Sequence, residues 1–421
     1  MKIDLQSFTR PCACGREHRL DVKEISIEAG AILRLPDLFR DGLLKPYACP
    51  LVICDRNTYE AAGRKVLELI KADCICLPPE GLHADNRAVY AVKSQMSGDT
   101  DLILAVGSGT VHDVSRYLSR DCGIPFVSVP TAASVDGFVS TVAAMTWNGL
   151  KTTFPAVAPI AVLADTSVFA AAPYRLTASG ISDLMGKYTA LADWKVSHLV
   201  TGEYFCDQIC GLEHRAVEAV RECLPDIKAG NPKACEKLMY ALLLSGLAMQ
   251  MAGNSRPASG AEHHVSHLWE MEVINPHTDA YHGEKVSAGL LMCLTEYERM
   301  KDAILSGRCR IKEYAGPELE LLKSTFGEKG LLDGILKENT PDPLLAVDAE
   351  RLKRVLPEIA GIWAELPSCQ EVKHMLTMAG CVTDMEGAGV DPALRQLTLT
   401  LSPYVRSRLT GMRLGKMLKM E

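Results

Sequence analysis

The chain has 421 residues and a formal net charge of −7, and 48% of its residues are hydrophobic against 23% charged. This length predicts about two to three domains, and the acidic balance argues against a nucleic-acid-binding protein. The evenly spread apolar residues exclude a disordered chain, and no stretch reaches the ~18 consecutive apolar residues of a membrane span. The start, MKIDLQSFTRPCACG, lacks the apolar core of a secretory signal. We therefore expect a soluble, cytoplasmic protein with neither a membrane nor a nucleic acid as partner.

Short apolar runs alternate with helical stretches from about residue 20 to residue 170. The runs are nearly continuously apolar, which is typical of strands buried on both faces of a parallel sheet. We expect strands at 25–30, 50–55, 72–78, 101–107, 125–130 and 160–165, with helices between them that include 57–72 and 110–122. This alternation predicts a doubly wound α/β domain over residues 1–172.

After Pro173 the strand signal fades, and apolar residues recur every three or four positions, which is the helical period. We expect helices at 181–200, 207–224, 234–253, 283–301 and 348–366. Clusters of Gly, Pro and Asn separate some of these segments. Residues 173–421 are therefore predicted to form an all-α domain.

The run DLILAVGSGTVHDVSRYL, residues 101–118, is typical of a buried strand, a glycine-rich turn and the start of a helix. Gly107, Ser108, Gly109 and Thr110 form the turn, where free amides and partial positive charge at the helix start suit a diphosphate. We also expect a positive φ at Gly109. A purely steric need for glycine explains the same pattern, so both interpretations stay open.

Polar residues follow two other predicted strands. Asp55 ends the strand at 50–55, where a carboxylate can bind the ribose hydroxyls of a dinucleotide. It precedes the glycine turn, whereas the common dinucleotide fingerprint has the acid about 20 residues after the glycines, so an ordinary fingerprint is a poor match. Thr131, Ser134 and Asp136, in VSVPTAASVDGFVS, follow the strand at 125–130. Any one of these last three residues could instead simply cap a helix.

Candidate metal ligands are spread over the second half of the chain. Asp183, in TASGISDLMGKY, lies at the expected opening of a helix, where the helix dipole also favours a carboxylate. His263 and His267, in SGAEHHVSHLWE, are four residues apart and share one helix face, and His282 opens another helix. Singly each histidine would be structural, but together with the carboxylate they are the ligand set of a divalent metal with an open catalytic position.

Fifteen cysteines in a chain without a secretory signal are read as reduced thiols, most of them small buried hydrophobic side chains. One cluster, Cys12, Cys14 and His18 in PCACGREH, could hold zinc. A fourth ligand is missing, however, and the spacing is tight for a structural site. A plain turn that carries two thiols is the alternative, and no function follows from the segment.

These motifs occur together in one order: Asp55 before GSGT, then PTAASVDGFVS, ASGISDLMGK, RPASGAEHHVSH and HGEKV. Over the whole chain the combination resembles the iron-type alcohol dehydrogenase and dehydroquinate synthase-like superfamily, and within it the sn-glycerol-1-phosphate dehydrogenases. The resemblance implies a Rossmann-like dinucleotide-binding domain, an all-α C-terminal domain and an active site in the interdomain cleft. It also implies NAD or NADP and one divalent metal ion, zinc or nickel.

Carried over by position, the resemblance assigns roles to residues of this chain. The implied metal ligands are Asp183, His263 and His282; a shifted match would make His264 the ligand, but the spacing to His267 favours His263. The implied catalytic and substrate-binding residues are Asp136, Asp183 and His267. The implied cofactor-binding residues are Asp55, Gly107, Ser108, Gly109, Thr110, His112, Thr131, Ser134 and Ser140.

The implied reaction is the reversible reduction of dihydroxyacetone phosphate to sn-glycerol 1-phosphate by a cytoplasmic homo-oligomer, in phospholipid biosynthesis. Lys151, Lys187 and Lys285 are candidates to bind the substrate phosphate. Asp55 favours NAD, while the adjacent Arg56 could accept the 2′-phosphate of NADP. The alternatives are a glycerol dehydrogenase or dehydroquinate synthase-like enzyme on the same scaffold, and a non-catalytic dinucleotide-binding or metal-sensing protein.

Overall fold

The computed structural model describes residues 3–421, and within them the chain forms two compact units. The first unit comprises the residues up to Asn148, Thr152–Leu184 and Arg215–Ser255, and the second comprises Gly149–Lys151, Met185–His214 and Arg256–Glu421. The units therefore do not divide at residue 172, where the sequence predicts the domain boundary. Helix α11 (Pro232–Ala252) accounts for part of this difference, because it packs against β1 (Glu24–Glu28), α6 (Thr166–Phe169) and η4 (Gly137–Val139) of the first unit.

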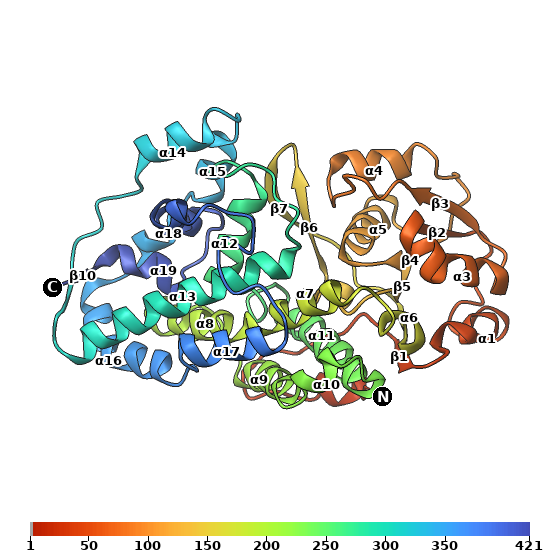
Figure 1. Ribbon diagram of the computed structural model, residues 1–421, viewed down its shortest axis with the longest axis horizontal. Coiled ribbons are helices and arrows are strands. Elements are labelled where there is room, and N and C mark those ends of the chain that lie inside the picture. The colour runs from red at the N-terminus through yellow and green to blue at the C-terminus, as the bar shows by residue number, and fades with distance from the viewer. Residues whose placement is uncertain (1–2) are drawn as a thin grey trace. The chain divides into compact units, whose positions relative to one another are not determined.

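A six-stranded parallel sheet organises the first unit, in the order β1-β8-β5-β4-β2-β3 (Figure 1). All six strands lie where the apolar runs predict them: β1 Glu24–Glu28, β2 Pro50–Asp55, β3 Asp73–Leu77, β4 Leu102–Gly107, β5 Phe126–Pro130 and β8 Ala161–Asp165. The prediction of burial on both faces is wrong for β3. It is an edge strand, and Cys74 and Cys76 are exposed on it.

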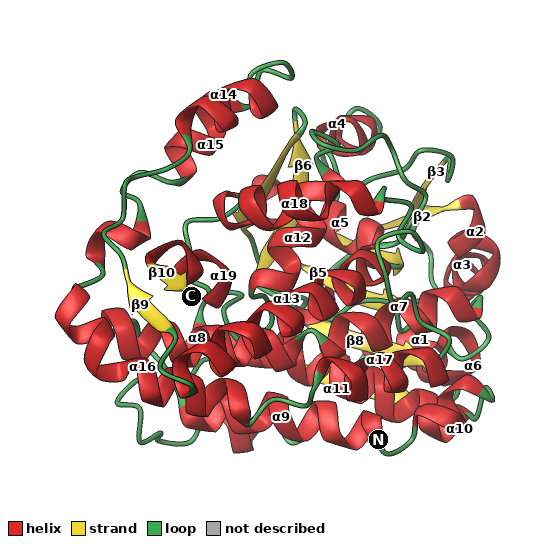
Figure 2. Ribbon diagram, turned by 60° about the vertical axis from the view of Figure 1, so that its left-hand side comes forward, coloured by secondary structure: helices red, strands yellow, loops and turns green. Residues whose placement is uncertain are grey.

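Two apolar cores cover the two faces of this sheet, because alternate residues of a strand point to opposite sides. In β2, Val52 and Cys54 belong to one core, and Leu51 and Ile53 belong to the other. The first core includes η2 Ala31–Arg34, α1 Leu35–Arg40, η3 Tyr59–Gly63 and α3 Arg64–Leu69; the second includes α4 Asn86–Lys93, α5 Gly109–Cys122 and β6 Val142–Trp147. This layering of helices and sheet, with the sheet strands yellow in Figure 2, confirms the predicted α/β class.

The other elements of the first unit lie mostly after β5. They are η4 Gly137–Val139, α6 Thr166–Phe169, α7 Tyr174–Met185, α10 Leu224–Lys228 and α11, together with η1 Leu5–Thr9 and α2 Arg56–Thr58 near the start of the chain. Strand β7 Leu150–Pro155 begins in the second unit and passes into the first after Lys151. The apolar runs do not predict β6 and β7, which pair as a separate two-stranded sheet. Because α7 begins at Tyr174, Asp183 lies near its C-terminal end, and the expected position at a helix opening is wrong.

Helices are the main elements of the second unit. They are α8 Lys187–Thr201, α12 Ala261–Glu270, α13 His282–Leu305, α14 Leu319–Phe326, α15 Leu332–Glu338, α16 Ala349–Ala364, α17 Cys369–Met378, α18 Arg395–Leu401 and α19 Gly411–Leu414, with the short η5 Pro343–Ala346, η6 Pro392–Leu394, η7 Ser402–Tyr404 and η8 Gly415–Met417. Helix α13 packs against α8, α12, α16 and α17. One short antiparallel pair, β9 Cys309–Ile311 and β10 Leu418–Met420, interrupts the helices.

Two further helices correct or complete the sequence prediction. The single helix expected over 181–200 is two helices, α7 and α8, which meet at Gly186. Helix α9 (Asp207–Arg221) begins in the second unit and passes into the first after His214. Within residues 3–421, no helix is both long and apolar enough to cross a membrane, and none of the fifteen cysteines, all of which lie in this range, forms a disulfide bond.

Candidate functional site

Two of the predicted site segments end neighbouring strands of the sheet. Asp55 ends β2 and Gly107 ends β4, and the register of these parallel strands places Ile53 beside Ala105. The chain changes direction across the sheet here, since β3 lies on one side of β2 and β4 lies on the other. Such a switch point is where open α/β sheets bind ligands. The first unit thus brings the expected ribose-binding carboxylate and the glycine turn to one edge of the sheet.

Asp55 also has a structural role at this edge. Its side chain is 8% exposed, and Oδ1 accepts hydrogen bonds from the backbone N–H groups of Asn57 (2.8 Å) and Thr58 (3.0 Å). Asp55 is therefore the N-cap of α2, a role that sequence reasoning missed. Because both bonds go to Oδ1, capping is compatible with ligand binding through Oδ2.

The glycine turn requires glycine for packing, and it leaves part of its backbone accessible. A Cβ atom on Gly107 would lie 2.6 Å from the Val111 side chain, and one on Gly109 would lie 3.0 Å from Cγ2 of Val135. Packing alone therefore requires the first glycine. Neither residue has a positive φ, so that expectation for Gly109 is wrong. Ser108, Gly109 and Thr110 are only partly buried, and a ligand could approach their backbone.

His112 lies beneath this turn and is 1% exposed. Its Nδ1 donates to the Ser108 carbonyl oxygen (2.9 Å), so its Nε2 accepts from the Ser128 hydroxyl (2.7 Å). Burial lowers the pKa of His112 to about 3, although the bond to Ser108 opposes the shift. His112 is thus a neutral side chain that fixes the turn from below.

The turn after β5 is also buried and highly hydrogen-bonded. The Thr131 N–H donates to the Gly107 carbonyl oxygen (3.0 Å), which joins this turn to the glycine turn. Ser140 Oγ accepts from the Val142 N–H (3.1 Å). The Ser134 hydroxyl is buried and has no hydrogen-bond partner within residues 3–421. Ser134 therefore has the free bonding capacity that a ligand contact needs.

Arg116 holds the same turn in place, and sequence reasoning missed it because no motif marks it. Its guanidinium is buried, donates to the Phe138 and Val142 carbonyl oxygens (both 3.1 Å) and pairs with Asp113 (2.7 Å). It also donates to the Gly137 carbonyl oxygen. An arginine on α5 thus fixes η4, the segment between Asp136 and Ser140.

Asp136 and Asp183 form a hydrogen-bonded pair within the first unit. The backbone N–H of Asp136 donates to Asp183 Oδ2 (2.9 Å), and Asp136 Oδ2 accepts from the Ser245 hydroxyl of α11 (2.9 Å). Helix α7 reaches the turn through Gly180, where a Cβ atom would lie 2.0 Å from the Ala133 carbonyl oxygen. The two expected catalytic carboxylates are therefore both buried and fixed by specific contacts.

Three of the expected histidines gather in the second unit, on facing parts of α12 and α13. The ring centroids of His263 and His282 are 5.2 Å apart, those of His263 and His267 are 6.0 Å apart, and those of His267 and His282 are 5.7 Å apart. The i, i+4 spacing thus puts His263 and His267 on one helix face, as predicted. Asp183 belongs to the first unit and these histidines to the second.

Two carboxylates orient two of these histidines. Glu262 Oε1 lies 2.7 Å from His263 Nδ1, and Glu270 Oε1 lies 2.7 Å from His282 Nδ1. Because an ionised carboxylate can only accept a hydrogen bond, Nδ1 of each ring carries the proton and Nε2 keeps its lone pair. This carboxylate–histidine pattern is the one that accompanies metal-ligating histidines. Sequence reasoning missed both acids, although Glu262 directly precedes His263 and Glu270 ends the same helix.

Glu262 is fully buried and the side chain of Glu270 is 12% exposed, yet both carboxylates stay ionised. Burial opposes ionisation of Glu262, but His263 and the Thr189 hydroxyl hold its pKa below the usual value. Burial likewise opposes ionisation of Glu270, but the Lys151 ammonium, 2.7 Å from Oε2, and His282 hold its pKa well below that value. Glu262 can therefore accept a hydrogen bond from His263, and Glu270 can accept one from His282.

His267 differs from its two neighbours. Its Nδ1 has no hydrogen-bond partner within the described residues, and burial lowers its pKa well below the usual value. His267, Glu270 and His282 offer ligand atoms within 4.8 Å of one another, which is a second possible metal set. Glu270 is already bonded to His282 and Lys151, however, so a metal would have to break those contacts.

His264, the alternative ligand, lies apart from this group of rings. It is 1% exposed, both ring nitrogens lack a partner within the described residues, and burial together with nearby arginines lowers its pKa. A neutral core histidine explains these features.

A basic group borders the histidines of the second unit. Lys151 pairs with Glu270, and Lys285 is 7% exposed with its pKa lowered by burial. Arg406, which sequence reasoning missed, donates from one guanidinium nitrogen to the Lys151 carbonyl oxygen (2.7 Å), while another is buried without a partner in the described chain. Lys187, the remaining candidate, is fully buried on α8.

Comparison with known proteins identifies the family. The family model for iron-containing alcohol dehydrogenase matches residues 26–173. The chain is 34% identical to a glycerol-1-phosphate dehydrogenase [NAD(P)+] from Geobacillus thermodenitrificans over 405 residues, which cover 94% of this chain and 92% of the relative. It is 32% identical to a protein of the same name from Geobacillus stearothermophilus, over 94% and 93% of the two chains.

Solved structures agree with the fold. The crystal structure of an iron-containing alcohol dehydrogenase from Corynebacterium glutamicum has a TM-score of 0.61 and 15% identity, and the match covers 95% of this chain and 96% of that one. At this identity the likeness concerns the fold alone. The identity to full-length relatives decides the narrower question, and the chain belongs to the glycerol-1-phosphate dehydrogenase family.

Proposed function

We propose that this protein catalyses the NAD(P)-dependent reduction of dihydroxyacetone phosphate to sn-glycerol 1-phosphate, reversibly and with a divalent metal ion. The observation that carries the proposal is the carboxylate–histidine arrangement, in which Glu262 and Glu270 leave the Nε2 atoms of His263 and His282 with lone pairs. Relatives at 32–34% identity over nearly the whole chain bear the name of this activity.

Asp183, His263 and His282 would hold the metal ion, zinc or nickel. One carboxylate oxygen and two imidazole nitrogens suit either metal and leave positions for substrate oxygens. The chemistry supplied by the bound groups is Lewis-acid polarisation of the ketone oxygen by the ion and hydride transfer from the nicotinamide. The protein's part is to fix the ligand side chains, and Glu262 and Glu270 do this for the two histidines.

The cofactor would bind at the strand-end edge of the first unit. The helix start at Ser108, Gly109 and Thr110 would receive the diphosphate, and Asp55 would receive the ribose hydroxyls. The remaining cofactor contacts would come from the turn after β5, namely Thr131, Ser134 and Ser140. His112 would act indirectly, because it is buried beneath the glycine turn and bonded to the Ser108 carbonyl oxygen.

Polar residues would contact the hydroxyl groups of the substrate, and cationic residues would bind its phosphate. Asp136 and His267 would contact the hydroxyl and ketone end, and His267 could hydrogen-bond a hydroxyl through a neutral ring. Lys285 and Arg406 would bind the phosphate, since both are buried cations beside the histidine group. Lys151 is already paired with Glu270 and would contribute charge at longer range.

An NADH-oxidation assay with dihydroxyacetone phosphate tests the proposal. The protein is first stripped of metal and then restored with zinc or with nickel, and the chirality of the product is determined. Turnover that depends on metal and gives sn-glycerol 1-phosphate is expected. The sn-glycerol 3-phosphate enantiomer, or no turnover with either metal, would contradict it.

Substrates distinguish the alternatives on the same scaffold. Equal turnover of dihydroxyacetone and its phosphate would indicate a glycerol dehydrogenase, which needs no phosphate site. Lys285→Met and Arg406→Gln should lower kcat/KM for the phosphorylated ketone and leave that for dihydroxyacetone nearly unchanged. NADH binding without turnover of any ketone would favour a non-catalytic sensor.

Metal content of single variants distinguishes the two possible ligand sets. His282→Ala should lose the ion while the fold survives, because His282 belongs to both sets. His263→Ala should lose the ion and His267→Ala should keep it, since only His263 of these two has a carboxylate behind Nδ1. His267→Ala should still bind NADH but turn over about 10²–10⁴-fold more slowly. Metal loss in His267→Ala and retention in His263→Ala would reverse the assignment.

We further expect the enzyme to be a cytoplasmic homo-oligomer, and fifteen cysteines that form no disulfide bond within the described residues are consistent with a reducing compartment. Light scattering on the purified chain tests the oligomeric state, and a monomer at micromolar concentration would contradict it.

A further inference from the structure

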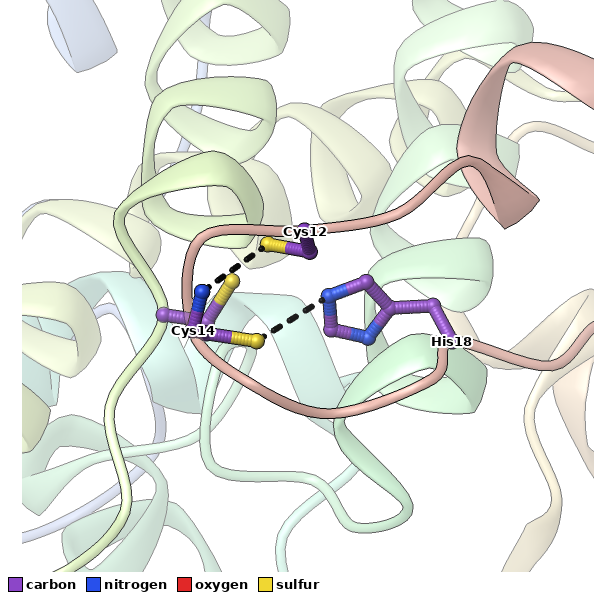
Figure 3. A group of neighbouring side chains, drawn as sticks. Cys12, Cys14 and His18 are labelled. Atoms are coloured by element: carbon purple, nitrogen blue, oxygen red, sulfur yellow. Dashed lines mark hydrogen bonds between the residues drawn. The ribbon is translucent and has the colours of Figure 1, made fainter.

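The N-terminal segment around Cys12 folds into a turn that gathers two thiols. The Gly15 N–H donates to the Cys12 carbonyl oxygen (3.2 Å), and Gly15 has a φ of +77°, which suits glycine. Inside this turn the Cys14 N–H donates to Cys12 Sγ (3.5 Å). Figure 3 shows the Cys14 sulfur facing the His18 ring and the Cys12 sulfur facing the backbone nitrogen of Cys14. The short Cys-x-Cys spacing is thus compatible with both cysteines binding one metal ion, since the backbone turns between Cys12 and Gly15.

His18 is prepared to accept a cation. It is 1% exposed, and its Nδ1 lies 3.0 Å from the Met251 carbonyl oxygen in the last turn of α11. A carbonyl oxygen can only accept, so Nδ1 carries the proton and Nε2 keeps its lone pair. Nε2 lies 3.5 Å from Cys14 Sγ (Figure 3). A backbone carbonyl that orients a histidine in this way is typical of metal sites.

The separations fit a tetrahedral zinc ion. Zinc–nitrogen bonds of about 2.0–2.1 Å and zinc–sulfur bonds of about 2.3 Å at the tetrahedral angle place the two ligand atoms about 3.6 Å apart. The observed separation between Cys14 Sγ and His18 Nε2 is 3.5 Å, and the ligand atoms of Cys12, Cys14 and His18 all lie within 4.8 Å of one another. Thiolate and imidazole together favour zinc over the harder divalent ions.

We propose that Cys12, Cys14 and His18 bind a structural zinc ion, distinct from the ion of the proposed active site. Binding releases the two thiol protons to solvent, and a water or a further cysteine of the chain completes the coordination. The ion would fasten the N-terminal segment to the C-terminal end of α11.

The same end of α11 contacts the segment beside the turn after β5. Gln250 accepts from the Asp21 N–H (2.8 Å) and donates to the Val139 carbonyl oxygen (2.6 Å). Val139 directly precedes Ser140, one of the expected cofactor residues. The zinc would therefore stabilise the helix end that supports this part of the first unit, without itself touching substrate.

Cobalt substitution of the full-length protein tests the site. Cobalt bound by thiolates gives intense sulfur-to-metal charge-transfer absorption in the near ultraviolet, whereas cobalt bound by carboxylate and imidazole alone does not. The wild type should show this absorption and the Cys12→Ser and Cys14→Ser variants should lose it. Cys122→Ser, which removes an exposed thiol elsewhere in the first unit, is the matched control and should keep it. Absence from the wild type, or persistence in both ligand variants, would overturn the proposal.

Two further measurements keep the result independent of folding and of the proposed catalytic ion. In the wild type, zinc should protect Cys12 and Cys14 from iodoacetamide while Cys122 reacts at an unchanged rate, as mapped by mass spectrometry; unprotected Cys12 and Cys14 would refute the site. Zinc-dependent protection of any other cysteine identifies the further thiolate. His282→Ala should keep the charge-transfer absorption, so a failure of the proposed active-site metal leaves this outcome unchanged.

Discussion

Acid should destabilise the first unit through His112, which is buried beneath the glycine turn. Its ring is 1% exposed, is bonded to Ser108 and Ser128, and lies edge-on to Phe138 with ring centroids 4.9 Å apart. Protonation would place a charge in this apolar site and would remove the acceptor that the Ser128 hydroxyl uses. Burial accordingly lowers the pKa of His112 to about 3.

The size of the effect follows from the difference between the folded and unfolded pKa values. The unfolded chain takes up a proton on His112 near pH 6.5, whereas the folded chain does not until about pH 3. The penalty is therefore absent above pH 6.5 and grows as pH falls, because the unfolded state binds more protons in that range. At about 1.4 kcal/mol per pH unit, the free energy of unfolding falls by about 2 kcal/mol between pH 6.5 and pH 5.

Urea unfolding of the wild type and of His112→Gln at pH 7.5 and pH 5 measures this contribution. Glutamine is uncharged at both values, so the variant should lose about 2 kcal/mol less on acidification than the wild type, whatever its stability at pH 7.5. Circular dichroism follows the transition, and the slope with urea should stay the same in both proteins. Equal losses would show that the folded state also binds a proton on His112 between pH 7.5 and pH 5, so that burial does not lower the pKa of this side chain.

Three other substitutions test the proposed site. Gly109→Val should weaken NADH binding strongly in a calorimetric titration with metal content unchanged, and an unaltered titration would show that the turn is only steric. Gly180→Ala should lower the free energy of unfolding by about 1–3 kcal/mol or more, since its Cβ would lie 2.0 Å from a carbonyl oxygen, whereas Gly361→Ala, with open space at the Cβ position, should not. Glu262→Gln should lower metal affinity about 10–100-fold, measured by competition with a chelator, because the amide no longer accepts from His263; equal affinity would contradict a supporting role.

The parallel sheet was predictable because each of its strands is a short, continuous apolar run. Strands β6 and β7 were not, since residues such as Thr146 and Thr152 are only partly buried and their pattern is neither fully apolar nor strictly alternating. The two compact units do not divide at residue 172 for another reason. Periodicity predicts that α11 is a helix but carries no information about its packing partner, which is the first unit.

The candidate site was predictable where ligand chemistry is local in sequence. His263 and His267 could be placed on one helix face from their spacing alone. Residues that act through distant contacts gave no such signal: Met251 lies 233 positions from His18, and Arg406 lies 255 positions from Lys151. The helix-dipole interpretation of Asp183 failed because the start of α7 at Tyr174 could not be located from the pattern.

Two motifs that the sequence presents separately, PTAASVDG and ASGISD, are packing partners along one face of α7. The Ser179 hydroxyl donates to the Ser134 carbonyl oxygen (3.2 Å), Gly180 faces the Ala133 carbonyl oxygen, and one turn later Asp183 accepts from the Asp136 N–H (2.9 Å). Ser179, Gly180 and Asp183 lie within about one turn of α7, so all three contact the same short segment, residues 133–136, as helix geometry allows. The number of residues between Gly180 and Asp183 therefore matches the segment 133–136 that both residues contact. An insertion within 180–183 would rotate Asp183 off that face and break its bond to Asp136, whatever ligand the carboxylate binds.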